Sequence, residues 1–93
     1  MKADKSGTEF GIFSFASVKK SPAKYEFAFK VIGATRLEVT VDGFNGILFQ
    51  GAGDALRVTN TFNKTGVRFF TLRGFDARGD VVGQVSRSVN IEP

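Results

Sequence analysis

The sequence predicts an all-β domain, folded as a seven-stranded antiparallel β-sandwich. Apolar and polar residues alternate along most of the chain, as expected for strands with one buried face. β-Branched and aromatic residues crowd these alternating segments, and glycine-, asparagine- and aspartate-containing turns separate them. The turns recur about every 8–12 residues, a spacing typical of sandwiches and small barrels. We expect strands near residues 9–18, 24–32, 36–42, 46–50, 55–62, 67–76 and 81–91.

The strands expected at residues 24–32 and 36–42 show the clearest alternation. Their apolar sets are Tyr25, Phe27, Phe29 and Val31 in the first, and Leu37, Val39 and Val41 in the second. Because neighbouring side chains of a strand point to opposite faces, each set predicts a core-facing row. We expect Phe27 and Phe29, together with Phe70 further along the chain, to lie in the core, because buried aromatic rings supply much of the apolar area that a small domain needs.

The strand expected at residues 46–50 has the least determined register. Two turn signals, Asp42-Gly43 and Asn45-Gly46, compete for the hairpin that precedes it. After it, Gly51-Ala52-Gly53-Asp54 predicts a flexible connection to residues 55–62, where Leu56 and Val58 alternate with polar residues.

The strand expected at residues 67–76 is apolar on both faces. Phe70, Leu72 and Gly74 would face one side, and Phe69, Thr71, Arg73 and Phe75 the other. Such a strand is central in its sheet, or has its second face covered by a loop, another domain or a partner chain. Glycine is costly inside a strand, so we expect another element to pack closely on Gly74. In residues 81–91, Arg87 interrupts a face formed by Val85, Val89 and Ile91.

The composition is that of one globular domain. Its 93 residues are 42% hydrophobic and 24% charged, and we expect a flexible segment at residues 1–8 followed by a domain at 9–93. Because no apolar run approaches the length of about 18 residues that a spanning helix needs, we expect no membrane insertion. The first seven residues are polar and lack the apolar stretch of a secretion signal.

The residue types argue against catalysis. The chain has no cysteine and no histidine, so it lacks a thiolate nucleophile, a disulfide framework and the commonest general base. Acidic residues near the turns do not form the spaced run of a calcium loop; they are Asp42, Asp54, Asp76 and Asp80. We therefore expect a non-enzymatic protein without a cofactor or a metal.

The net charge of +4 arises from 13 basic and 9 acidic residues that are dispersed along the chain. Dispersed charge is typical of a solvated surface, whereas nucleic-acid binding is marked by basic runs. Arg73-Gly74-Phe75 matches only the first three positions of an RNA-recognition consensus, and Asp76 and Ala77 then break it. A basic nucleic-acid-binding domain is the weakest of our alternatives.

The segment from Gly66 to Ile91 resembles the last hairpin of bacterial immunoglobulin-like modules, a group that includes fibronectin type III-like domains. It has a glycine, an alternating strand, the turn Asp76-Ala77-Arg78-Gly79-Asp80 and a final alternating strand. Residues 37–43 resemble the strand that leads into the third hairpin of those modules, so the resemblance spans about residues 22–91. It lacks the Cys…Trp…Cys core, and Arg87 replaces a small or apolar residue.

The resemblance implies an immunoglobulin-like topology and accessory work in a cell-surface or exported bacterial protein, such as spacing, adhesion, or carbohydrate or protein binding. Expected partners are a protein or polysaccharide at a cell surface, and neighbouring domains of a parent chain. The best candidate anchors are Phe44, Arg73 and Phe75, since aromatic and arginine side chains are enriched at interface centres. Arg78 is a fourth candidate, because Arg78-Gly79-Asp80 is an integrin-recognition tripeptide, although turn chemistry alone also accounts for it. The main alternative is a phage or fimbrial type of structural subunit that pairs through sheet edges.

Overall fold

The computed structural model describes residues 13–93, which form seven strands joined by turns. The strands are β1 (Phe13–Ser21), β2 (Lys24–Val31), β3 (Arg36–Val41), β4 (Phe49–Ala52), β5 (Ala55–Thr61), β6 (Gly66–Phe75) and β7 (Val81–Ile91). The expected segment at residues 1–8 and the expected strand residues 9–12 lie outside the described part of the chain. Among residues 13–93 there is no helix that is long and apolar enough to cross a membrane.

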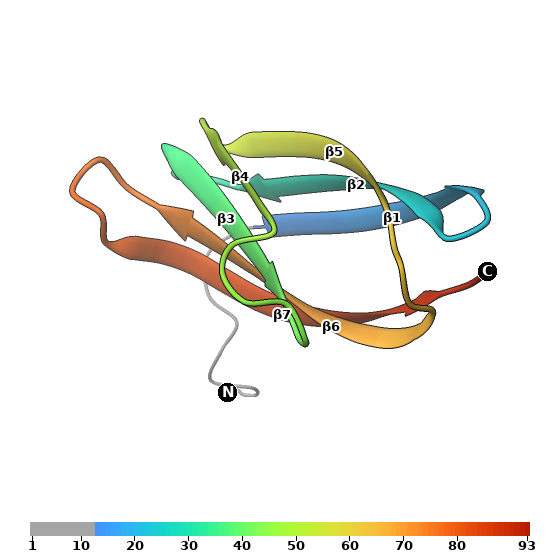
Figure 1. The fold of residues 1–93 in the computed structure, drawn as a ribbon. Coiled ribbons are helices and arrows are strands. Elements are labelled where there is room, and N and C mark those ends of the chain that lie inside the picture. The colour runs from blue at the N-terminus through green and yellow to red at the C-terminus, as the bar shows by residue number, and fades with distance from the viewer. Residues whose placement is uncertain (1–12) are drawn as a thin grey trace, which may run out of the picture.

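The strands form two antiparallel sheets that face each other (Figure 1). One has the order β1-β2-β5 and the other the order β4-β3-β6-β7. The expected all-β fold with two antiparallel sheets is therefore confirmed. In Figure 1 the β6–β7 turn lies at one end of the molecule and the end of β7 at the other.

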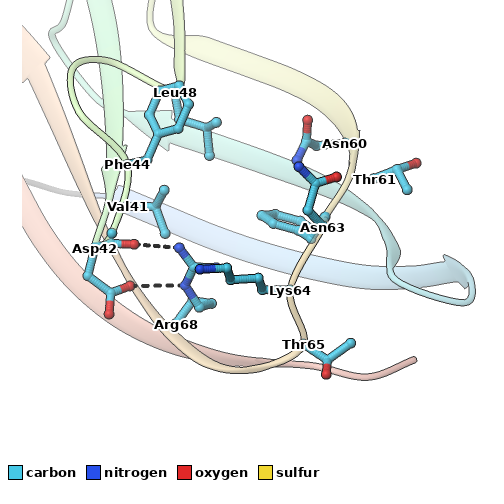
Figure 2. A pocket seen from close by; sticks show the side chains of 12 residues that line it. Val41, Asp42, Phe44, Leu48, Asn60, Thr61, Asn63, Lys64, Thr65 and Arg68 are labelled. Atoms are coloured by element: carbon cyan, nitrogen blue, oxygen red, sulfur yellow. Dashed lines mark hydrogen bonds and ion pairs between the residues drawn. The ribbon is translucent and has the colours of Figure 1, made fainter.

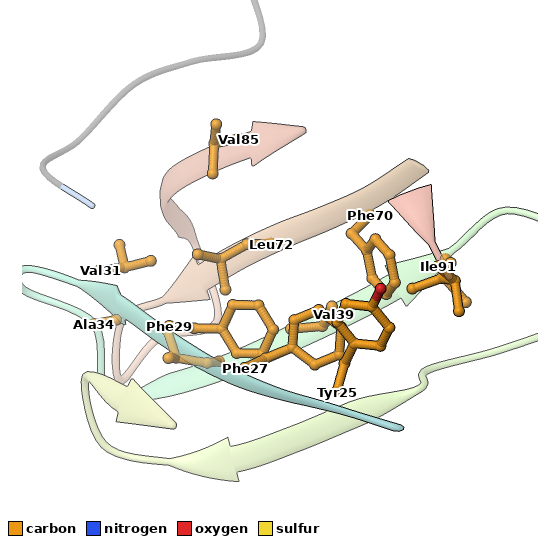
Figure 3. Packing of buried hydrophobic residues seen from close by; sticks show 12 residues of the cluster. Tyr25, Phe27, Phe29, Val31, Ala34, Val39, Phe70, Leu72, Val85 and Ile91 are labelled. Atoms are coloured by element: carbon orange, nitrogen blue, oxygen red, sulfur yellow. The ribbon is translucent and has the colours of Figure 1, made fainter. Parts of the chain in front are cut away.

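Phenylalanine rings fill the space between the sheets (Figure 3). The side chains of Phe27, Phe29 and Phe70 are 0–2% exposed, which confirms the expected core positions of the two rings on β2. The rings of Phe27 and Phe29 stack with centroids 5.8 Å apart, and Phe70 reaches across from the other sheet to within 5.2 Å of Phe27. Such aromatic pairs contribute beyond the apolar area that they bury.

Strand β6 is central, lying between β3 and β7, as its two apolar faces predicted. Phe70, Leu72 and Gly74 face the core, and their neighbours face outward. A Cβ atom added to Gly74 would lie 2.6 Å from Cγ1 of Val31 and 3.0 Å from Cβ of Ala34. The expected close packing on Gly74 is thus confirmed, and it comes from the end of β2 and the turn that follows.

The expected bounds of β4 are wrong. The strand occupies residues 49–52 rather than 46–50, because both competing turn signals belong to one longer loop. Gly43 and Gly46 both have positive φ angles, of 79° and 93°. The chain therefore returns to β3 only at Leu48, whose N–H donates to the Val39 carbonyl at 2.8 Å. Gly51 and Ala52, expected in a flexible connection, instead pair with β3.

Strand β1 continues to Ser21, three residues beyond the expected end. It stays paired with β2 across a bulge between Lys19 and Ser21, and Ala23, with a φ of 57°, lies in the turn that joins the two strands. At the same end of the molecule, the Tyr25 hydroxyl donates to the Asn90 carbonyl at 3.1 Å and accepts from the Glu92 N–H at 2.9 Å. Tyr25 therefore joins β2 to the end of β7 across the two sheets.

Arg87 lies on the core-facing side of β7 but at its open margin, where its guanidinium lies over the Phe13 ring at 5.3 Å from the centroid. The arginine that interrupts the apolar pattern thus closes the side of the sandwich with its stem and keeps its charge near solvent.

Candidate functional site

The outer face of the four-stranded sheet carries a row of polar side chains, one from each strand. Glu38 pairs with Gln50 and with Arg73, and Arg73 pairs with Gln84. Each residue of this row alternates with core residues of its own strand, so the alternation that buries the core also exposes the row. We call this surface the sheet face, formed by Arg36, Glu38, Gln50, Val67, Phe69, Thr71, Arg73, Phe75, Gln84 and Ser86.

The two guanidinium groups of the sheet face are held in place. Nε of Arg73 donates to Oε1 of Gln84 at 2.9 Å. Arg36 donates to the Glu38 carboxylate, and its Cζ lies 4.3 Å from the centroid of the Phe75 ring. Both guanidinium groups are planar, are fixed by neighbouring strands and retain further N–H donors, so they are ready to bind without large loss of entropy.

The other half of the sheet face is apolar and open. Val67 and Phe69 are each 58% exposed, although they lie on the central strand. Between these halves the hydroxyls of Thr71 and Ser86 lie 3.0 Å apart. The face therefore combines exposed apolar area with fixed hydrogen-bonding groups.

The structure brings two of the four predicted anchors together on this face. Arg73 lies in the polar row, and Phe75 is half-buried under Arg36 at the end of β6. Arg78 follows at the adjoining turn, with a side chain 82% exposed. A hollow of about 460 Å³ connects the turn to the edge of the sheet face; it is lined by Thr35, Arg36, Gln50, Gly51, Ala52, Asp76, Ala77 and Gly79.

The Arg78-Gly79-Asp80 tripeptide is organised by Asp76. Oδ1 of Asp76 accepts from the backbone N–H groups of Arg78 at 2.9 Å and Asp80 at 3.0 Å. The hydrogen bond from Asp80 is the main cause that holds the pKa of the Asp76 carboxyl below its ordinary value, and partial burial opposes it. Arg78 also pairs with the Asp80 carboxylate at 3.3 Å, so the two charged groups of the tripeptide face each other.

The fourth predicted anchor, Phe44, lies elsewhere. It is 50% exposed in the loop between β3 and β4 and contributes to a separate cavity of about 530 Å³ at the end of the sandwich (Figure 2). We call this cavity the end groove. It is lined by Val41, Asp42, Gly43, Phe44 and Leu48 on one side and by Asn60, Thr61, Phe62, Asn63, Lys64, Thr65 and Arg68 on the other.

Arg68 is the most firmly positioned charge of the end groove. Its Nη2 donates to the Asp42 carbonyl at 2.5 Å, and its Nε lies 3.4 Å from the Asp42 carboxylate. The guanidinium packs against the backbone of Gly43, where an added Cβ would lie 3.1 Å from Nη2. Its side chain is only 18% exposed. In Figure 2 the Lys64 side chain points into the groove toward this guanidinium.

Sequence reasoning missed the residues that complete both surfaces. For Arg68 a signal was present, because it has the same parity as Phe70 and Leu72 and is thus a charge on a core-facing row. Gln84 and Glu38 gave no such signal, because a polar residue on an outward-facing row is ordinary. They belong to the sheet face only because the pairing of β3 and β7 with β6 places both of them opposite Arg73.

The side chains on these two surfaces are suited to non-covalent recognition. Within residues 13–93 no group of three or more histidine, cysteine, aspartate or glutamate side chains is arranged to hold a metal ion. Guanidinium groups, amides and exposed rings are instead groups that recognise a surface or a ligand.

Comparison with models of known families, with curated proteins and with solved structures finds no match.

Proposed function

We propose that this protein is a non-catalytic immunoglobulin-like accessory module that contacts a protein partner through the sheet face. The strand order supports the topology. In immunoglobulin-like sandwiches the first, second and fifth strands share one sheet, and the third strand joins the last two in the other. Strands β1, β2 and β5 and strands β3, β6 and β7 follow that division, and β4 extends the second sheet.

The observation that carries the proposal is the composition of the sheet face. Val67 and Phe69 expose apolar area on one half of the face, and Arg36 and Arg73 are held in fixed positions on its other half. Arginine and aromatic residues are enriched at the centres of protein interfaces, and side chains that are already ordered lose less entropy on binding. A protein surface with its own apolar area and carboxylates would complement this face.

The accessory role and the cell-surface or exported location are part of the proposal and rest on the family resemblance. The absence of histidine and cysteine from the sequence supports a role in binding rather than in catalysis.

A second candidate function is self-assembly through a sheet edge. β7 is an edge strand of 11 residues, and Arg87 is its only charged residue. Long edge strands with few charges offer unpaired backbone groups to another strand. β4, at the opposite edge of the same sheet, is only four residues long.

Photocrosslinking in cells that express the protein tests both candidates. A photoreactive phenylalanine analogue at position 69 reports on the sheet face, and the same analogue at position 57, exposed on the other sheet, is the control. We expect an adduct from position 69 alone, and its loss in the Arg73→Glu variant with an unchanged circular dichroism spectrum.

The adduct's mass distinguishes the candidates. A product larger than two copies of the 10.1 kDa chain, or of another composition, supports a distinct protein partner. A product of two copies means that the sheet face contacts a second copy rather than a distinct partner. A mass that rises with concentration in light scattering, without an adduct from position 69, supports self-assembly through the β7 edge instead. Equal adducts from positions 69 and 57, or no adduct, would refute the sheet face as the contact surface.

A further inference from the structure

We infer that the end groove is a second, independent binding site, which takes an acidic oligosaccharide bearing a sugar carboxylate. The groove lies between the β3–β4 loop and the β5–β6 loop, apart from the sheet face, and the inference does not depend on the proposed protein partner. Its volume of about 530 Å³ is in the range of small-ligand sites.

The end groove carries two cationic side chains, Arg68 and Lys64. Arg68 uses Nε and Nη2 to bind Asp42, which leaves its Nη1 without an acceptor within residues 13–93. Lys64 has no ion-pair partner in this part of the chain and points toward the same guanidinium (Figure 2). The Asp42 carboxylate offsets one of these two cations, so an anion that binds between the Arg68 and Lys64 groups meets a net positive charge. A planar carboxylate matches the guanidinium geometry.

The end groove is also lined by two aromatic rings, those of Phe44 and Phe62. Phe44 exposes half of its surface at the groove, although a phenylalanine ring is costly to leave in water. Phe62, half-buried against the core, lines the same groove. The faces of aromatic rings carry partial negative charge and attract the weakly positive C–H groups of a sugar ring.

The polar side chains of the end groove favour a sugar acid over a phosphate-rich ligand. Asn60 and Asn63 line the groove with side-chain amides that make no hydrogen bond to residues 13–93. Each amide offers donors and an acceptor, which suits the hydroxyl groups of a sugar. The Asp42 carboxylate, 52% exposed at the groove, accepts from hydroxyls but repels a dense array of phosphates. A sugar with one carboxylate per ring satisfies all of these groups.

The test uses an array of acidic oligosaccharides, printed with each carboxylate free and as its methyl ester. The ester keeps the ring stereochemistry and removes only the charge. We expect one or more free acids to bind and the matching esters to bind at least about tenfold more weakly, because the ester cannot form the charge-assisted hydrogen bonds. Calorimetry with the best free acid then gives the affinities of the variants.

Lys64→Gln should weaken binding of the free acid about tenfold and leave the ester almost unaffected, whereas Phe44→Ala should weaken both. Lys20→Gln, which removes an exposed charge on β1, is the matched control and should change nothing. Phe69→Ser, on the sheet face, should also leave sugar binding intact. No bound acid on the array, equal binding of acids and esters, or equally tight binding of inorganic phosphate would overturn the inference.

Discussion

Substitution of Gly74 by alanine is the most exacting test of the packing described here. Gly74 packs closely against Val31 of β2 and Ala34 of the turn that follows, and the atoms nearest to an added Cβ belong to short side chains rather than to a flexible end. An added Cβ would lie 2.6 Å from Cγ1 and 2.8 Å from Cβ of Val31. To restore ordinary van der Waals distances, β2 and β6 must separate locally by several tenths of an ångström.

The expected cost follows from two opposing effects. Overpacking of a close-packed core costs about 1–3 kcal/mol, and contacts this short belong at the upper end of that range. Alanine recovers about 0.5–1 kcal/mol, because it has less backbone entropy to lose on folding than glycine has. We therefore expect Gly74→Ala to lower the free energy of unfolding by about 1–2 kcal/mol, and the melting temperature by about 5–15 °C for a domain of this size.

Urea unfolding followed by far-ultraviolet circular dichroism measures this change. The matched control is Gly51→Ala in the same sheet, where the nearest atom to an added Cβ is the flexible tip of Leu56 at 2.9 Å. That side chain can rotate away, so we expect a change of no more than about 0.5 kcal/mol.

A double-mutant cycle identifies the clash. Val31→Ala removes the Cγ1 atom that the new methyl group meets, so the double variant should be at least about 0.5 kcal/mol more stable than the sum of the single changes predicts. Wild-type stability for Gly74→Ala, or strict additivity with Val31→Ala, would refute the close approach of the two sheets.

Two further substitutions test the ends of the sandwich. Tyr25→Phe removes the hydroxyl that joins β2 to the Asn90 carbonyl and the Glu92 N–H, and should cost about 1–2 kcal/mol in urea unfolding; an unchanged midpoint would mean that the bridge contributes nothing in solution. Asp76→Asn keeps an acceptor oxygen in the β6–β7 turn and removes the charge. The pKa of Asp76 is lowered in the folded protein, so its charge stabilises the fold above the ordinary value of 3.8, and this contribution is lost as the pH falls through the lower folded pKa. The stability difference between wild type and Asp76→Asn should therefore be complete at pH 7, begin to shrink as the pH falls to about 3.8, and vanish only below the lower folded pKa; a difference that grows in acid would contradict this assignment.

The sequence was sufficient to predict the strands and most of the core, because both depend on local alternation. Phe27, Phe29 and Leu72 occupy the side of the strand that their parity predicts. The exceptions were the end of β1, which continues three residues further than expected, and β4, where either of two adjacent glycine turns could have formed the preceding hairpin. Only tertiary pairing with β3 determines that both glycines belong to one loop.

The candidate sites were only partly predictable. Arg73 and Phe75 were chosen because arginine and aromatic side chains are enriched at interface centres, and the structure places both on the sheet face, where their role as anchors stays a prediction. Their partners Gln84 and Arg36 come from β7 and β3, and only the register of the sheet aligns them. Phe44 was grouped with the anchors of the sheet face, but the β3–β4 loop places it at the end groove instead. Sequence alone could not separate these two surfaces.

The account depends most on β6 having one face sealed in the core and the other open to a partner. Because the chain has no cysteine, single cysteine substitutions can be labelled against a clean background. We expect Phe69→Cys, at a position 58% exposed, to react with a thiol reagent at least about tenfold faster than Leu72→Cys, at a position 0% exposed. Thr71→Cys should react at an intermediate rate. Equal rates at positions 69 and 72, or faster labelling at position 72, would contradict the two-faced strand and the sheet face built on it.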